Sequence, residues 1–443
     1  MRLFNSKTNQ LETFKPIETG KVKMYVCGPT VYDEIHIGNA RPIIVFDTLR
    51  RIFEAQGYEV DMVSNYTDVD DKIINKAISE KVDEKTITDR NIKAYNVIKS
   101  RLNTRTLSAS LRVTETMDEI IAFIKALVDE GYAYNVNGNV YFRVLKSENY
   151  GEISKQRIDD LLVGARVEED PEKESPIDFS LWKKTEIGIQ WDSPWGKGRP
   201  GWHTECVVMI DHHFHGKIDI HGGGMDLKFP HHENELAQAK ACYHHDLANV
   251  WMHNGMLNID GEKMSKSIGN VLSARDVIDK VGANTVRWMM LSVHYRSPLN
   301  ISEEVIEQAK TELQKAQSIL TQVEIRYDLA DQKIKVMQDE TFVQQFIDAV
   351  SDDLNTPNGM KIIFDVIKAL NQDQRQKDIS EEILLKHYGA LRKILDILGI
   401  AFKPIVLTSA QKDLFVKWNQ AKADKDFNAA DLYRKALIEQ QLL

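Results

Sequence analysis

Residues 21–65 read KVKMYVCGPTVYDEIHIGNARPIIVFDTLRRIFEAQGYEVDMVSN and decide the fold. Lys21 to Cys27 is a predicted strand that stops at Gly28-Pro29, and Glu59 to Asn65 is a second one. Between them, four apolar residues recur at the spacing of one helix face: Val45, Leu49, Ile52 and Phe53. Strand, helix and strand in this order predict a βαβ unit of a parallel sheet. Ligands bind beyond the carboxyl ends of such strands, so the loop 27–38 is a candidate binding site.

The length of 443 residues suggests about three domains at roughly 150 residues each. With 42% apolar and 28% charged residues, the composition is that of an ordinary globular protein, which excludes the disordered and fibrous classes. Apolar runs such as Cys206 to Ile210 are far shorter than the roughly 20 residues that cross a bilayer. Met1 to Gln10 is too polar for a secretory signal. We therefore expect a cytoplasmic protein with no membrane span.

The number of cysteines, the net charge and the distribution of histidines further limit the class of protein. Three cysteines cannot form a disulfide framework, which favours a reducing compartment. A net charge of −9 argues against indiscriminate coating of nucleic acid but leaves room for a local RNA-binding patch. Ten of the thirteen histidines lie between His203 and His253, and this clustering indicates a site.

The pattern predicts an α/β protein with a Rossmann-type parallel sheet, an inserted domain, a C-terminal helical bundle and a short tail. The insertion begins after the first strands and contains a helix at Met117 to Glu130 and a strand at Asn139 to Val144. Gly255 to Lys266 is a predicted hairpin turning at Asp260-Gly261, and the tail carries one more helical stretch. The expected divisions are 1–105, 106–189 (insertion), 190–254, 255–301, 302–400 (bundle) and 401–443 (tail).

Three common motifs are absent or out of context. Gly196 to Gly201 matches G-x-G-x-x-G, but Pro200 falls where a helix should open and no apolar strand precedes the match. No Walker A sequence occurs. His232 to Leu236 lacks the second histidine of H-E-x-x-H. These observations weaken dinucleotide binding, P-loop chemistry and zinc proteolysis as functions.

A metal site is one interpretation of the histidine-rich region. A helix starting near Pro230 places His231 and Glu235 on one face at i and i+4, where both can meet one ion. Cys27 and Cys206 could add two thiolates, a set that favours zinc. The alternative is that the cysteines are small core residues and the histidine packs against a helix. Spacing alone favours this alternative, because such pairs are common and the cysteines are far apart in sequence.

Two loops are candidates for binding phosphate. His36-Ile37-Gly38-Asn39 enters the predicted helix, where backbone N–H groups and the positive helix terminus attract an anion. Lys263-Met264-Ser265-Lys266-Ser267 is a basic loop after the hairpin, able to hold Lys266 over a polyphosphate. Each loop taken singly is weak evidence.

Together the two loops resemble the signature pair of class I aminoacyl-tRNA synthetases. Further segments are similar to the cysteinyl-tRNA synthetase family and cover nearly the whole chain: Tyr25 to Tyr32, Thr67 to Lys72, Gly201 to Cys206, Asp219 to Gly224, Phe229 to Glu235, Trp251 to Gly255, His294 to Pro298 and Asp353 to Pro357.

The resemblance implies one zinc ion per chain, with ligands Cys27, Cys206, His231 and Glu235. In the family this zinc receives the thiolate of the substrate cysteine. Zinc favours a soft thiolate over the hydroxyl of serine, so cysteine is chosen without an editing domain.

The resemblance also implies activation of L-cysteine by ATP with Mg²⁺, followed by transfer to the 3′ end of tRNA(Cys), by a monomeric enzyme. His36 and Lys266 would be the catalytic residues, because they stabilise charge on phosphate. Thr67, Trp202 and His221 match family positions around the amino acid. The implied ATP-binding residues are His36, Gly38, Asn39, Gly222, Gly223, Gly224, Asp226, Lys263, Ser265 and Lys266.

Two departures from the family pattern affect these expectations. Asn39 stands where the family's first signature commonly has a second histidine, and an amide can donate a hydrogen bond but cannot carry charge. The chain ends at Leu443, before a Gly- and Trp-containing stretch that usually follows, which leaves anticodon recognition open.

Two other functions compete with the synthetase. A related ligase that joins cysteine to an amino sugar would not need the tail from Thr408 onward, so that tail disfavours it. A noncatalytic RNA- or zinc-binding protein derived from the fold would be expected to lose motif residues. His36, Lys266 and the four ligand positions are all present here.

Overall fold

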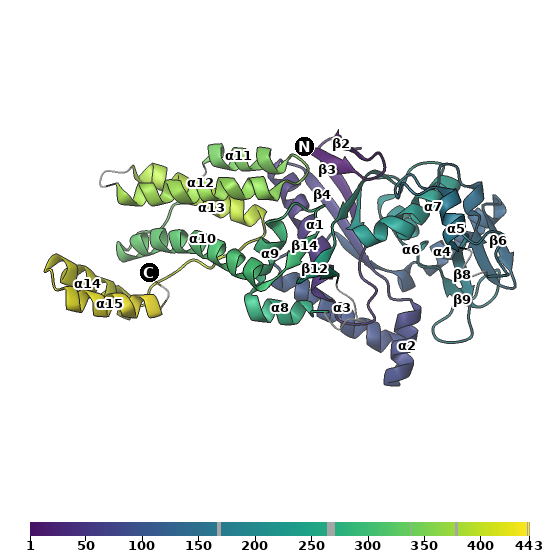
Figure 1. Ribbon diagram of the computed structural model, residues 1–443, viewed down its shortest axis with the longest axis horizontal. Helices are drawn as coiled ribbons and strands as arrows, with labels where there is room; N and C mark the ends of the chain where they lie inside the picture. The colour runs from purple at the N-terminus through teal and green to yellow at the C-terminus, as the bar shows by residue number, and fades with distance from the viewer. Residues whose placement is uncertain (166–169, 264–270, 338, 377–379, 441, 443) are drawn as a thin grey trace. The chain divides into compact units, whose positions relative to one another are not determined.

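The computed structural model divides into two units, which are described in turn (Figure 1). Unit 1 comprises 1–283, 294–301 and 351–354, and unit 2 comprises the rest of the chain. The residues that the structure describes are 1–165, 170–263, 271–337, 339–376, 380–440 and 442.

Unit 1 is built on a five-stranded parallel sheet with the strand order β11-β10-β3-β4-β5. Its strands are β3 (Lys21–Val26), β4 (Glu59–Tyr66), β5 (Ala109–Arg112), β10 (Ile218–Gly224) and β11 (Ala248–Asn254). The two strands expected from the sequence are confirmed, and both are largely buried, as strands covered by helices on each face should be.

Helices cover both faces of this sheet. Helix α1 (Ile37–Ala55) buries its apolar stripe and is followed by Gly57 at φ +89°, a conformation that favours glycine. Helices α6 (Glu205–Phe214) and α7 (Glu233–Tyr243) lie on the side opposite to α1 (Figure 1). The chain leaves β3 toward β4 on one side and later adds β10 on the other, so the strand order reverses at β3. A ligand crevice is therefore expected at the carboxyl ends of β3 and β10.

The insertion carries α4 (Met117–Asp129), α5 (Ile158–Ala165) and an antiparallel sheet in the order β6-β7-β8-β9. The strands are β6 (Ala133–Val136), β7 (Asn139–Phe142), β8 (Phe179–Lys184) and β9 (Gly198–Pro200). In the parallel sheet β5 pairs with β4, and in the antiparallel sheet β9 pairs with β8. The divisions at 106 and 189 stay predictions. The position of β9 also confirms that Gly196 to Gly201 does not open a dinucleotide-binding helix.

The remaining elements of unit 1 surround these two sheets. They are β1 (Arg2–Asn5), β2 (Gln10–Thr13), α2 (Asp71–Glu80), α3 (Glu84–Arg101), β12 (Leu257–Ile259), β13 (Glu262–Lys263), α8 (Ala274–Val281) and β14 (Leu299–Ile301). Short helical turns occur at Val113–Glu115, Val144–Lys146, Met225–Leu227 and Lys228–His232. The expected hairpin turn is confirmed: β12 pairs with β13, and Asp260 and Gly261 both have positive φ.

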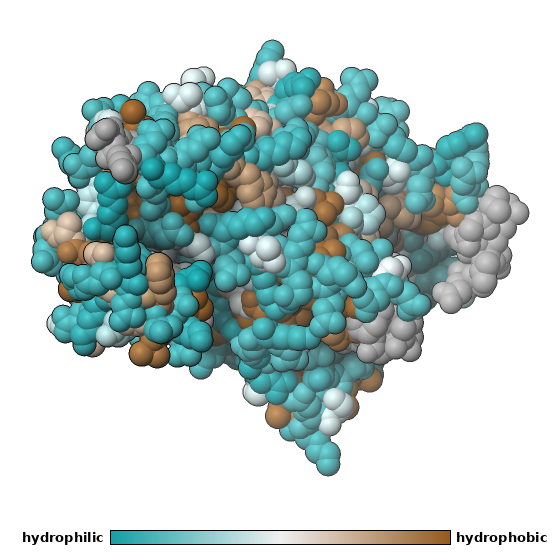
Figure 2. Space-filling model, turned by 60° about the vertical axis from the view of Figure 1, so that its left-hand side comes forward, coloured by the Kyte–Doolittle hydropathy of each residue, from teal (hydrophilic) through white to brown (hydrophobic). Residues whose placement is uncertain are grey.

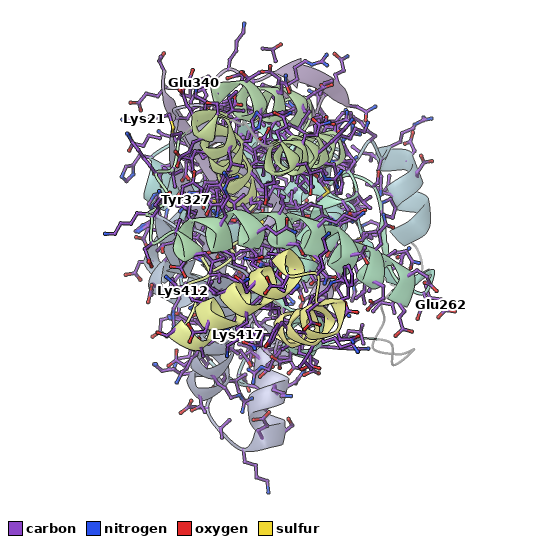
Figure 3. All side chains as sticks on the ribbon, turned by 90° about the vertical axis from the view of Figure 1, so that its left-hand side faces the viewer. Lys21, Glu262, Tyr327, Glu340, Lys412 and Lys417 are labelled. Carbon is purple, nitrogen blue, oxygen red and sulfur yellow. The ribbon has the colours of Figure 1, made fainter. Side chains whose placement is uncertain are left out.

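Unit 2 is helical, as the apolar stripes predict. Its helices are α9 (Ala283–Leu291), α10 (Glu303–Leu329), α11 (Glu340–Val350), α12 (Thr356–Arg375), α13 (Glu381–Ile397), α14 (Ser409–Ala423) and α15 (Phe427–Glu439). Figure 3 shows Tyr327 on α10 and Lys412 on α14, and the ammonium of Lys412 donates to the Asp328 carbonyl of α10 at 2.6 Å.

The prediction of a single helical stretch in the tail is wrong, because α14 and α15 are separate helices. Lys425 adopts φ +58°, which breaks the helix. The side chain of Asp426 then accepts the Ala429 N–H and caps the second helix. Ile325 of α10 and four tail residues form a small apolar core: Leu407, Phe415, Leu437 and Leu442.

A buried carboxylate ties the tail linker to the bundle. Glu324 of α10 is 4% exposed and forms an ion pair with Arg392 of α13. It also accepts the Tyr388 hydroxyl at 2.8 Å and the Ile405 N–H at 2.8 Å. All of these partners are hydrogen-bond donors, so the buried charge is well compensated.

The surface is mainly hydrophilic on the face drawn in Figure 2, with hydrophobic residues in scattered small groups. Within the described part of the chain, every helix is either too short or too polar to cross a membrane.

Candidate active site and metal centre

The four predicted metal ligands converge beyond the carboxyl end of β3. The sulfur atoms of Cys27 and Cys206 are 3.7 Å apart, and Cys206 Sγ is 3.7 Å from His231 Nε2. Glu235 Oε1 is 2.9 Å from His231 Nε2 and 3.9 Å from Cys27 Sγ. A tetrahedron with zinc–sulfur bonds of about 2.3 Å has an edge of about 3.8 Å, so the sulfur spacing fits a zinc ion.

Local structure explains why these residues meet. Cys27 directly follows β3. Cys206 is the second residue of α6 and is buried. His231 and Glu235 lie one turn apart where the chain enters α7, so the helical spacing predicted from the sequence is confirmed. Glu235 is fully buried and His231 is 1% exposed.

A second set of potential ligands overlaps the first and shares Cys27 and Glu235. It adds His221 of β10 and His232 in place of Cys206 and His231. A metal-bound histidine almost always donates its other ring N–H to a partner. His231 meets this requirement, because its Nδ1 lies 3.0 Å from His203 Nδ1. His221 Nδ1 is buried with no partner among the described residues. The chemistry therefore favours the set with His231, and His221 supports Glu235 through a 2.6 Å contact.

The electrostatics of the cluster favour a bound cation. The hydrogen bond from Cys27 lowers the pKa of the Cys206 thiol to about 7. Burial alone would raise the pKa of Glu235, but His231 and His221 outweigh it and hold that pKa well below its usual range. Burial lowers the pKa of His203 to about 3, so its neutral ring can accept a hydrogen bond from His231. Burial raises the pKa of the Cys27 thiol well above its usual range, so the cluster favours one thiolate and one carboxylate, and Cys27 would lose its proton to a bound metal.

The expected amino acid-binding residues surround this cluster. The indole of Trp202 is 39% exposed and stacks on His231 with ring centroids 4.3 Å apart. Thr67 follows β4, is buried, and donates to Glu205 at 3.2 Å. Trp202 therefore borders open space, whereas Thr67 and His221 act from behind the wall of the site.

The loop before α1 is the first of the two segments expected to bind phosphate. His36 is the N-cap of α1 in an extended conformation, and Gly38 lies in the first turn. The side chain of Asn39 accepts the His36 N–H at 3.2 Å. Asn39 thereby stabilises the loop conformation without carrying charge. The N–H groups of Ile37 and Asn39 donate to the carbonyls of Leu272 and His36, each at 2.9 Å.

A cavity of about 1020 Å³ opens beside these elements. Its lining includes several residues predicted from the sequence: Cys27, His36, Gly38, Asn39, Trp202, Gly224 and Asp226. Gly222 and Gly223 lie deeper, and a Cβ on Gly222 would come within 2.3 Å of Phe46 of α1. At Gly222, close packing of helix on sheet explains the absence of a side chain.

The second signature loop falls largely outside the described residues. Lys263 ends β13, while Ser265 and Lys266 lie in the part of the chain that the structure does not describe. The described residues after the loop pair with the His36 region: the Ile37 N–H donates to the Leu272 carbonyl at 2.9 Å, and the Ala274 N–H to the Ile35 carbonyl at 3.1 Å.

Arg41 of α1 binds the two segments that precede and follow the second signature loop in sequence, near residues 255 and 297. Its guanidinium is fully buried and donates to the carbonyls of Gly255 and Met256, each at 2.8 Å, and of Ser297 at 2.7 Å. A weaker contact reaches the His294 carbonyl at 3.4 Å.

Sequence reasoning missed several buried residues of the site. Glu205, His232 and His253 lie within the segments that resemble the family, but the sequence alone predicts no role for them. Arg41 and Ser6 belong to no recognisable sequence pattern. Burial raises the pKa of Glu205 well above its usual range. The clustering of histidines was a signal that could have drawn attention to His232 and His253.

Comparison with known proteins agrees with this geometry. Residues 13–311 match the family model "tRNA synthetases class I (C) catalytic domain", and residues 345–403 match a DALR domain. A cysteine–tRNA ligase of Staphylococcus haemolyticus is 47% identical, and one of Staphylococcus saprophyticus is 46% identical. Each alignment covers 100% of this chain and 97% of the relative.

Solved structures with low sequence identity share the fold. The methionyl-tRNA synthetase of Mycobacterium tuberculosis, solved with methionyl-adenylate, has a TM-score of 0.62 at 16% identity and covers 86% of this chain and 90% of its own. A leucyl-tRNA synthetase complex of Agrobacterium radiobacter has a TM-score of 0.61 at 12% identity, covering 87% and 84%.

The parallel sheet, the loop before α1 and the matched catalytic domain define a class I aminoacyl-tRNA synthetase. Within that class, the full-length identity to curated relatives decides the family. The chain belongs to the cysteine–tRNA ligases.

Proposed function

We propose that this enzyme joins L-cysteine to the 3′ end of tRNA(Cys) through a cysteinyl adenylate, with zinc held by Cys27, Cys206, His231 and Glu235. The observation that carries the proposal is the convergence of two thiols, an imidazole and a carboxylate beside the nucleotide loop. Bound zinc would supply a soft Lewis-acidic position for the substrate thiolate.

The protein's own groups bind and orient the reactants. Trp202 covers the cluster and His221 holds Glu235 in place, which fixes the pocket for a small side chain. The N-terminus of α1 with His36, together with Lys266, stabilises charge on the phosphates of ATP with Mg²⁺. Catalysis then rests on positioning and electrostatics, with no covalent enzyme intermediate.

The C-terminal regions are proposed to bind tRNA, the bundle 302–400 and the tail 401–443 in particular. The DALR match at 345–403 supports this assignment, as does the full-length similarity to enzymes named cysteine–tRNA ligases. The same similarity argues against an amino-sugar ligase. A monomeric state and a cytoplasmic location stay predictions.

One assay tests the proposal and its alternatives. Cysteine-dependent ATP–pyrophosphate exchange should occur without tRNA, and labelled cysteine should be transferred to tRNA(Cys) only when tRNA is supplied. Elemental analysis of the purified chain should give one zinc. Transfer to an amino sugar in place of tRNA, or no activation of cysteine, would contradict the proposal.

A further inference from the structure

A chain of hydrogen bonds connects the N-terminal hairpin to Cys27. Ser6, which follows β1, places its Oγ 2.8 Å from His253 Nδ1. His253 of β11 places its Nε2 2.8 Å from His232 Nδ1. His232 Nε2 lies 3.3 Å from Cys27 Sγ. Ser6, His253 and His232 are at most 4% exposed, so each link is shielded from water.

The direction of these hydrogen bonds is fixed once one end is known. Each neutral imidazole has one donor and one acceptor nitrogen. Both rings are buried, and among the described residues neither ring hydrogen-bonds a carboxylate that could hold a second proton on it, so each is neutral. A thiolate can only accept. A Cys27 thiolate therefore requires a proton on His232 Nε2, hence one on His253 Nε2, hence a donated Ser6 hydroxyl proton.

We propose that Ser6 and His253 are positioning residues that set the tautomer of His232, so that its Nε2–H donates to the Cys27 thiolate in the zinc-loaded enzyme. This inference rests on the zinc site of the proposed function. A hydrogen bond to a metal-bound thiolate disperses its charge and orients it, as outer-shell partners of metal ligands generally do.

When Cys27 is a thiol, each hydrogen bond between Ser6 and Cys27 has the opposite donor and acceptor. The S–H group then donates to His232 Nε2, His232 Nδ1–H donates to His253 Nε2, and His253 Nδ1–H donates to Ser6 Oγ. The two arrangements differ by a single proton, the one that Cys27 loses when a metal binds. A serine hydroxyl both donates and accepts, so Ser6 can end the chain in either direction.

The first test removes the terminal hydroxyl. Ser6→Ala should weaken zinc binding about 10-fold, at the lower end of the 10- to 100-fold effect typical of outer-shell partners. Thr8→Ala is the matched control, because Thr8 lies on the same hairpin and its hydroxyl bonds Glu12 instead of the histidines. Zinc affinity is measured by competition with a colorimetric chelator, without any assay of activity.

The second test reads the tautomers directly. With histidine labelled in ¹⁵N, NMR of the zinc-loaded enzyme should show His232 and His253 both protonated at Nε2. In Ser6→Ala the zinc-loaded enzyme should lose the single tautomer at His253, a change that a purely structural role would not produce.

A third variant tests the coupling between the two residues. In His253→Gln the side-chain amide donates to His232 independently of Ser6, so adding Ser6→Ala should cause no further loss of zinc affinity. Unchanged zinc affinity and unchanged tautomers in Ser6→Ala would overturn the inference while leaving the proposed function intact. Failure of the unmodified chain to bind zinc would contradict the proposed function itself.

Discussion

Two buried carboxylates, Glu235 in unit 1 and Glu324 in unit 2, have opposite kinds of partners. Glu324 is surrounded by a guanidinium, a phenol and a backbone N–H, all permanent donors. Glu235 faces two imidazoles and a thiol, groups whose protons can move or leave. His231 and Cys27 among them are proposed metal ligands. The first arrangement is complete as it stands and joins helices. The second leaves several lone pairs aimed at one point, which is the property of a cation site.

The largest expected effect comes from removing a ligand of the Glu235 cluster. If zinc selects the substrate, the intact enzyme should prefer cysteine over serine by roughly 10⁴ or more in adenylation, the scale reached when a wrong substrate leaves a specific site unsatisfied. Cys206→Ala should lose zinc and collapse this ratio.

Cys242→Ser is the matched control, because Cys242 lies at the end of α7 away from the cluster. It should keep both zinc and activity. ATP–pyrophosphate exchange with each amino acid gives the ratio. A preference of only about a hundredfold in the intact enzyme is within reach of shape alone and would argue against selection by zinc.

Removing the counter-charge of Glu324 should affect stability and leave the chemistry alone. Arg392→Met strands a buried carboxylate, which typically costs about 3–5 kcal/mol. Lys386→Met on the same helix breaks only an exposed ion pair with Glu382 and should leave stability nearly unchanged. Denaturant unfolding measures both values. Loss of cysteine-dependent exchange in folded Arg392→Met would show that Glu324 is more than a structural tie.

Lys266→Ala separates the choice of substrate from the rate of reaction. The ammonium is expected to meet the leaving pyrophosphate, and losing one such group typically costs on the order of 10² to 10³ in rate. Exchange should slow by this factor with the cysteine-over-serine ratio preserved and tRNA binding little changed. An unaltered exchange rate would remove Lys266 from the catalytic step.

The smallest effect is expected from a partly exposed carboxylate, Asp246. Burial alone would raise its pKa, but Lys7 at 2.5 Å outweighs burial and lowers it. A lowered pKa in the folded state stabilises the protein above the unfolded value of about 3.9, and the gain is lost as the pH falls through the folded value. Asp246→Asn should therefore cost at most about 1 kcal/mol at pH 7. Urea unfolding should show this difference disappearing in acid, and a difference that grows in acid would reverse the sign.

Local pattern was sufficient for the elements that carry the site. The βαβ unit at residues 21–65 and the i,i+4 pair of His231 and Glu235 follow from periodicity, and both are confirmed. Cys27 and Cys206 illustrate the limit. Their approach depends on a sheet that places α6 beside the end of β3, so spacing favoured packing and only the family resemblance pointed to a shared metal.

Residues that act through tertiary contacts left little trace in the sequence. Ser6 and His253 are separated by 247 positions, and a serine after a short strand has no pattern of its own. The sequence predicts one helix in the tail where the structure has two, because Asp424, Lys425 and Asp426 are polar residues that also fit a continuous exposed helix face.

The contacts of Arg41 determine which neighbouring positions can be substituted during evolution. It binds its partners through carbonyl oxygens, which every amino acid possesses, so Met256, His294 and Ser297 are free to change without losing the contact. Gly255 is the exception, because a Cβ there would lie 2.5 Å from the Ser297 carbonyl. Position 41 itself has no substitute, since lysine lacks the planar fork that reaches several carbonyls at once. Alignments of homologues should therefore show an invariant arginine facing variable neighbours, a pattern in which covariation reveals nothing of the contact.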